Sequence, residues 1–160
     1  MSIEAFVIPV VAGLIGCKWG MQLWLSRLNQ RHARAHAGAV PEAYAHLIDP
    51  DTYAKSVTYT LAKSRLGQVE LTFDALVLAV VLFSGVLPWS YAVVTSHLGT
   101  SVWALAGWLL LTGVALSLAS LPFDWYAQFK LEQRFGFNTT TSGLWWLDRL
   151  KGLLLALALG

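Results

Sequence analysis

Three long apolar runs constrain the fold of this chain more than any other feature. They occupy residues 3–25, 71–94 and 102–121, and each has about 20 residues or more, the number needed for a helix to cross the hydrocarbon core of a bilayer. Only 12% of the residues are charged, about half the share that is usual in soluble domains. The sequence therefore predicts an all-α, polytopic helical membrane protein with three complete transmembrane helices.

Two further features modify this layout of spans. A fourth apolar run, residues 152–160, is too short to cross a bilayer by itself. Trp145 and Trp146 precede it and suit a membrane interface, so we expect the start of a fourth span and a natural chain that continues beyond Gly160. Within the second run, Pro88 lacks a backbone donor, and we expect it to kink that helix or end it early.

The distribution of Lys and Arg predicts the orientation of the chain. Residues 26–70 and 122–151 contain every Lys and Arg except Lys18. The positive-inside rule then places both segments in the cytoplasm and the N-terminus outside. The first run lacks the basic start of a signal peptide, so we expect an uncleaved first span.

We expect an amphipathic helix in the first cytoplasmic segment. Asp49 and Pro50 provide a cap and a first-turn proline, and Gly67 fits a helix stop. Between them, apolar residues recur every four positions and form one stripe, which consists of Tyr53, Val57 and Leu61. This stripe is expected to pack on the membrane surface or on a neighbouring domain.

The second cytoplasmic segment is unusually aromatic for a loop. Its aromatic residues include Phe123, Trp125, Tyr126, Phe129, Phe135 and Phe137. Pro122 is expected to begin a helix that Gly136 ends, and Asn138 or a following Thr would cap the next helix. Glu132 and Arg134 would form a charged pair that fixes the shape of the loop. Because so many rings need a surface to pack against, we expect this segment to dock.

Two ionisable residues lie in or near the predicted spans. Lys18 is about two-thirds of the way along the first span, and Asp74 lies near the start of the second. An intramembrane charge is a functional candidate by default, and Asp74 could be its partner. Alternatively, the long stem of Lys18 lets its amine reach the interface, and Asp74 lies among the lipid headgroups. The sequence leaves both interpretations open.

The chain offers little sign of chemistry of its own. His32 and His36 have the spacing of a zinc-protease helix, but Ala33 stands where such a helix has its general base. The only cysteine, Cys17, lies in the first span, and no nucleophile set can be assembled around it. A net charge of +2 is too small to indicate nucleic-acid binding. We therefore predict that this segment itself has no catalytic or metal-binding residues.

The stretch of residues 121–155 resembles a signature of the type 1 CAAX prenyl proteases, which are integral-membrane zinc metalloendopeptidases. Residues 49–67 also resemble that family's helix between its first and second spans. The features that match in the first stretch are Leu121-Pro122-Phe123, Tyr126, Phe129, Glu132, Phe135-Gly136-Phe137-Asn138, Thr140, Asp148 and Lys151-Gly152-Leu153.

The resemblance implies a bundle of seven transmembrane helices around a water-filled chamber, with zinc at its cytoplasmic side. The zinc ligands of that family come from a His-Glu-x-x-His helix and a later Glu, which would lie downstream of Gly160. This segment would then be inactive alone and would form chamber wall and a loop bordering the catalytic domain. Its partners would be the lipid bilayer, the C-terminal catalytic part of the same protein, and a peptide or membrane-protein substrate.

Two other functions remain open from the sequence. The chain could be a small non-enzymatic membrane protein that binds a partner through its aromatic loop. It could also be a transporter fragment in which Lys18 and Asp74 relay charge. If it is a protease segment, its substrate is either a prenylated peptide or a misfolded membrane protein.

Overall fold

The computed structural model describes residues 3–38, 40–41, 44 and 46–159, and in that part of the chain every regular element is a helix. Three helices are long and apolar enough to cross a membrane. The main helices, in chain order, are α1 (Ile3–Ala35), α2 (Pro50–Phe83), α3 (Val86–Leu98), α4 (Val102–Tyr126) and α6 (Ser142–Leu159). The predicted all-α membrane fold is therefore confirmed.

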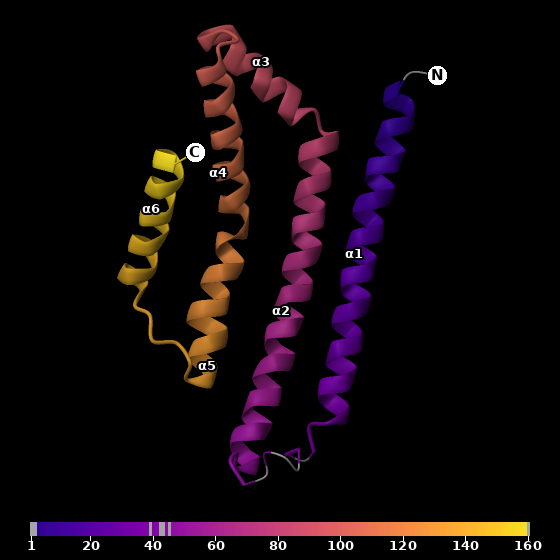
Figure 1. The fold of residues 1–160 in the computed structure, drawn as a ribbon, viewed down its shortest axis with the longest axis vertical. Helices are drawn as coiled ribbons and strands as arrows, with labels where there is room; N and C mark the ends of the chain where they lie inside the picture. Colours follow the sequence, from indigo (N-terminus) through magenta and orange to yellow (C-terminus); the bar gives the residue numbers. More distant parts are fainter. Residues whose placement is uncertain (1–2, 39, 42–43, 45, 160) are drawn as a thin grey trace.

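The long helices stand side by side, as Figure 1 shows, in the order α1, α2, α4 and α6, while α3 runs obliquely across one end from α2 to α4. Neighbours in this row are antiparallel, and the connection between α1 and α2 lies at the opposite end from α3.

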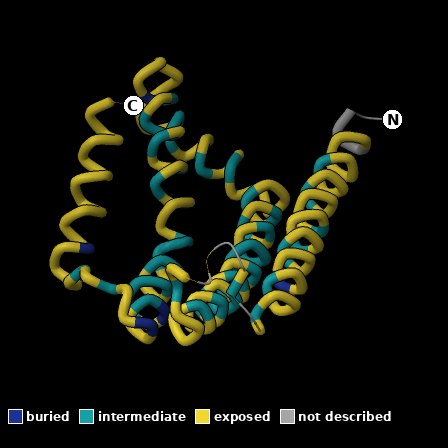
Figure 2. The backbone as a smooth tube through the Cα atoms, turned by 60° about the horizontal axis from the view of Figure 1, so that its bottom comes forward, coloured by how far each residue is buried: buried dark blue, intermediate teal, exposed yellow. Residues whose placement is uncertain are grey.

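Very few side chains are buried inside this row of helices. Among the described residues, the buried ones are Gln30, Ala104, Leu131, Phe135 and Trp145, and Figure 2 shows the exposed and half-buried positions along all the helices. Apolar side chains on such exposed helices need a non-aqueous surrounding, which a bilayer supplies. The chain is an integral, multi-pass membrane protein.

Helix α2 corrects one prediction about residues 26–70. Asp49 caps it as expected, since its side chain accepts hydrogen bonds from the backbone amides of Asp51 and Thr52 at 2.9 and 3.3 Å. The helix does not stop at Gly67 but continues to Phe83. A glycine inside a helix costs only about 1 kcal/mol, which the good helix formers on either side offset.

The second predicted span, residues 71–94, is not one helix. The chain breaks between α2 and α3 at Ser84 and Gly85, and Gly85 has a φ of 80°, in the left-handed region that glycine adopts without strain. Pro88 then lies in the first turn of α3, where backbone N–H groups have no helical partner. The helix therefore ends early, which was one of the two expected outcomes, but it ends at Gly85, and Pro88 follows the break and does not cause it.

The end of α4 also differs from the prediction. Pro122 lies inside α4 and does not begin a helix; α4 continues into a π-helical segment, η2 (Ala127–Glu132), and then α5 (Gln133–Phe135). The expected stop at Gly136 is confirmed. Gly136 has a φ of 76°, and its N–H donates to the Gln133 carbonyl at 3.1 Å, as in a glycine-ended helix.

Helix α6 carries the expected cap. The hydroxyl of Thr141 accepts from the backbone amide of Leu144 at 3.3 Å, so a Thr that follows Asn138 begins this helix.

Candidate functional site

Within residues 122–151, residues 135–138 form a turn that follows α5, here called the 135–138 turn. It rests on the first half of α2. The Tyr59 ring meets the edges of Phe135 and Phe137, with ring centroids 5.3 and 4.9 Å apart. The Lys55 ammonium lies 5.4 Å from the centre of the Phe137 ring. Edge-to-face rings and a cation above a ring face are both attractive, so the predicted docking has a defined surface, although the sequence did not identify it.

The two Phe side chains of this turn differ in exposure. Phe135 is 7% exposed, whereas Phe137 is 47% exposed. Phe135 therefore anchors the turn to α2, while Phe137 keeps almost half of its surface free for a further contact.

Asn138 holds the turn from within. Its side-chain carbonyl oxygen accepts from the Gln128 amide at 2.7 Å and from the Thr140 backbone amide at 2.8 Å. Asn138 thus ties η2 to the segment that leads into α6, and the helix cap that was expected of Asn138 or a following Thr falls to Thr141.

A second aromatic group fastens α6 to the end of α4. The Trp145 ring is buried, with the Phe129 ring 6.1 Å away at its edge and the Arg149 guanidinium 5.0 Å from its centroid. Arg149 also forms an ion pair of 2.8 Å with Asp124. Both charged groups of this pair are partly exposed, so it orients α6 more than it stabilises it.

The expected pair between Glu132 and Arg134 is absent. Ion pairs within the described residues are Arg149–Asp124 and an exposed contact of 3.8 Å between Lys151 and Asp148. Residues two apart on a helix point in different directions, and the Arg134 guanidinium lies near the Phe135 ring, 5.9 Å from its centroid.

Lys18 and Asp74 are both exposed, and no ion pair joins them in the described part of the chain. The structure thus brings the 135–138 turn together with α2 but does not assemble a charge relay. The role of these two residues stays a prediction.

A polar seam between α1 and α2 was missed by the sequence analysis. Gln68 donates to the Ser26 hydroxyl at 3.0 Å, and Gln30 donates to the Ser64 hydroxyl at 3.0 Å. Further along, the Trp19 indole donates to Thr72 at 3.2 Å. The sequence does contain a pattern that indicates this seam, because its polar residues recur every four positions on α2 and, in part, on α1.

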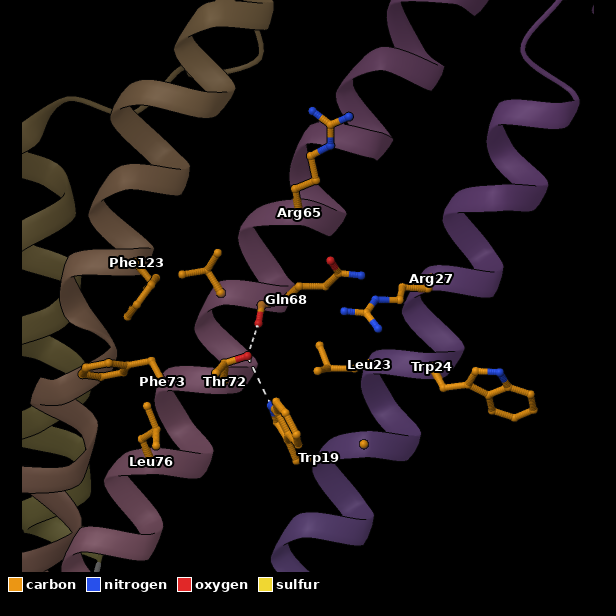
Figure 3. A pocket seen from close by; sticks show the side chains of 12 residues that line it. Trp19, Leu23, Trp24, Arg27, Arg65, Gln68, Thr72, Phe73, Leu76 and Phe123 are labelled. Carbon is orange, nitrogen blue, oxygen red and sulfur yellow. Dashed lines mark hydrogen bonds between the residues drawn. The ribbon is translucent and has the colours of Figure 1, made fainter.

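Beside this seam lies a groove of about 860 Å³ between α1 and α2. Leu76 and Trp19 lie towards one end of its lining, and Arg27 and Arg65 lie towards the other (Figure 3). In Figure 3, Arg27 reaches from α1 towards α2 beside Gln68, while Arg65 stands further along α2.

The described residues do not fit a resident zinc ion. Within the part of the chain that the structure describes, no three His, Cys, Asp or Glu side chains gather at one place. The rings of His32 and His36 lie 4.2 Å apart, and His36 Nδ1 is 2.9 Å from the His32 carbonyl oxygen.

Residues 29–160 match the family described as "CAAX prenyl protease N-terminal, five membrane helices". The chain belongs to this family. It is its N-terminal membrane region, and the resemblance carried by the aromatic segment is confirmed.

Individual relatives agree with this assignment. The chain is 33% identical over 166 residues to CAAX prenyl protease 1 of Saccharomyces cerevisiae, covering 94% of this chain and 35% of the relative. It is 29% identical over 149 residues to CAAX prenyl protease 1 homolog of Caenorhabditis elegans, covering 91% and 33%. The chain therefore spans about a third of the length of these CAAX prenyl proteases.

A solved structure has the same fold. The crystal structure of S. mikatae Ste24p superposes with a TM-score of 0.84 at 23% identity, over 96% of this chain and 36% of that one.

Proposed function

We propose that this chain is the membrane front of a CAAX prenyl protease-like zinc metalloendopeptidase, which cleaves peptides or proteins at the membrane. In this proposal its helices form part of the wall of a chamber, and the 135–138 turn borders the catalytic domain. The zinc ligands would lie downstream of Gly160. Family membership supports the proposal, as do relatives about three times as long as this chain.

The observation that carries the proposal is the position of the 135–138 turn. Phe135 and Asn138 fix the turn against α2 and η2, while Phe137 remains 47% exposed beside Lys55. A rigid turn with a free aromatic face suits a contact with a further part of the same protein, because little ordering entropy is lost on docking.

The proposed orientation places this turn in the cytoplasm, with the N-terminus of α1 outside. It is supported by the Lys and Arg residues, all of which except Lys18 fall in residues 26–70 and 122–151. A turn on that side would face a catalytic domain with zinc at the cytoplasmic side of the chamber.

The test uses the full-length protein purified from membranes. We expect it to contain zinc, to cleave a prenylated peptide or a misfolded membrane protein, and to lose cleavage after chelation and regain it when zinc is restored. A matched double variant, His32→Ala with His36→Ala, should keep both zinc and activity, because the proposed zinc ligands lie downstream of Gly160.

Two results would contradict the proposal. A full-length protein without zinc and without cleavage would support the alternative of a non-enzymatic membrane protein that binds a partner through its aromatic loop. Loss of zinc in the His32 and His36 variant, with folding intact, would place the metal in this segment instead.

A further inference from the structure

The groove between α1 and α2 combines features that the proposed proteolysis does not use. It has an apolar length lined by Trp19, Leu23, Phe73 and Leu76, and two guanidinium groups, Arg27 and Arg65, towards the other end. An amphipathic groove with cations at one end matches a phospholipid, which has apolar chains and an anionic phosphate.

The two arginines have no partner among the described residues. Neither Arg27 nor Arg65 takes part in an ion pair there, and both side chains are exposed. The nearby carboxylates Glu70 and Asp124 are not among the residues that line the groove. The positive charge of the groove is therefore available to a ligand from outside this part of the chain.

The arginines also lie at the depth of a lipid headgroup. Arg27 follows the first apolar run, residues 3–25, by two positions, and Arg65 precedes the apolar run that begins at residue 71. The chains of a lipid in the groove would extend from there along Leu23 and Leu76, deeper in the bilayer. Basic sites between transmembrane helices at this level attract anionic headgroups.

We propose that this groove binds one anionic phospholipid, with its phosphate held by Arg27 and with Arg65 adding positive charge at the same end of the groove. The charge of the groove selects an anionic lipid over a zwitterionic one, and the polar seam between α1 and α2 keeps the helices at the separation that the groove needs. Trp19 belongs to both the groove and the polar seam, since it lines the groove and its indole donates a hydrogen bond to Thr72.

The experiment places the full-length protein in nanodiscs with equal amounts of phosphatidylcholine and phosphatidylglycerol. Native mass spectrometry after release then measures the ratio of the two lipids retained. We expect phosphatidylglycerol to be enriched on the wild type. Arg27→Gln and Arg65→Gln should each lower the ratio about fivefold, since a cation near the membrane surface contributes about 1 kcal/mol.

Three control variants separate this site from general surface charge and from misfolding. Arg31→Gln removes the same charge one turn along α1, outside the groove lining, and should leave the ratio nearly unchanged. Arg27→Lys keeps the charge and should retain the enrichment. Gly20→Leu should displace both lipids by filling the groove, and the added side chain has room because no atom lies within 4 Å of a Cβ at Gly20.

Three outcomes would overturn the proposal. One is an equal effect of Arg31→Gln and Arg27→Gln, which would indicate general surface charge. Another is no enrichment of phosphatidylglycerol on the wild type. The third combines two results: the wild type retains no lipid, and Gly20→Leu unfolds the full-length protein. Together they would indicate that a protein segment, and not a lipid, fills the groove.

Discussion

Replacing Phe135 by Ala removes the ring that anchors the 135–138 turn to α2. Phe135 is 7% exposed, and burying a Phe side chain stabilises by about 1.5–3 kcal/mol. Its edge-to-face contact with Tyr59 at 5.3 Å adds about 0.5–1.5 kcal/mol. We therefore expect Phe135→Ala to lower the free energy of opening this turn by about 2–4 kcal/mol.

Hydrogen exchange in nanodiscs measures this opening directly. The amides of Gly136 and Phe137 donate to the Gln133 and Glu132 carbonyl oxygens at 3.1 and 2.9 Å, so their exchange reports on the closed turn. Exchange should become at least roughly 30-fold faster in the variant, the factor that about 2 kcal/mol implies.

Two comparisons make the test specific. Phe137→Ala should have about half the effect of Phe135→Ala, because Phe137 is already 47% exposed and burial energy follows the area removed from water. Phe83→Ala, an exposed Phe at the far end of α2, should leave exchange at the turn unchanged. Unaltered exchange in Phe135→Ala, or a larger effect of Phe137→Ala, would mean that Phe135 does not anchor the turn.

Three further predictions concern a side-chain bridge, a helix cap and a glycine. Asn138→Ala should weaken the attachment of the turn by about 1–3 kcal/mol, because the Gln128 side-chain amide and the Thr140 backbone amide lose their acceptor. Limited proteolysis should then cut more readily between η2 and α6, and unchanged protease resistance there would contradict this. The hydrogen bonds to Asp49, first from the Thr52 side chain and then from a backbone amide, lower the pKa of Asp49. The contribution of the Asp49 carboxylate to the start of α2 is therefore complete at neutral pH and lost as pH falls through that lowered pKa. Amide exchange at the first turn, divided by the intrinsic exchange rate at each pH, should rise with acid in the wild type. An equal rise in Asp49→Asn, which caps without titrating, would exclude this carboxyl as the cause. Gly85→Ala should destabilise the protein by about 1–2 kcal/mol. The cause is the backbone and not a clash, because φ at Gly85 is 80°, a left-handed conformation that alanine adopts only with strain, while the space around it is open. Thermal unfolding should show this loss for Gly85→Ala but not for the helical control Gly107→Ala.

The helical membrane fold could be predicted because lipid leaves few alternatives for long apolar runs. The stop at Gly136 could be predicted as well, since a glycine after a helix readily adopts a left-handed conformation. These features depend on local sequence and on the solvent, and so they can be recognised without tertiary contacts.

The remaining features depend on competition between local preference and packing. Gly67 and Pro122 both suggested helix boundaries, but α2 and α4 continue through them. Gly85 marks the actual break and was overlooked beside the more conspicuous Pro88. Local signals of this kind each amount to about 1–3 kcal/mol, which the surrounding helix can override.

The candidate site was predicted in part. The aromatic segment was expected to dock, and Phe135, Phe137 and Asn138 were named, but their partners on α2 and η2, Tyr59 among them, were not. Tyr59 lies 76 positions before Phe135, and no pattern in a single sequence connects positions so far apart. The hydrogen-bonded seam of α1 and α2 had a four-residue spacing that could have been recognised.

We propose that this membrane region borders the catalytic part of a longer protease through the 135–138 turn. The decisive measurement places a photoreactive amino acid at position 137 of the full-length protein, with position 103, an exposed Trp at the start of α4, as the control. We expect a cross-link from position 137, but not from position 103, to the part of the same polypeptide that would hold the zinc ligands. Cross-links from position 137 only to lipid or to a separate protein would contradict it.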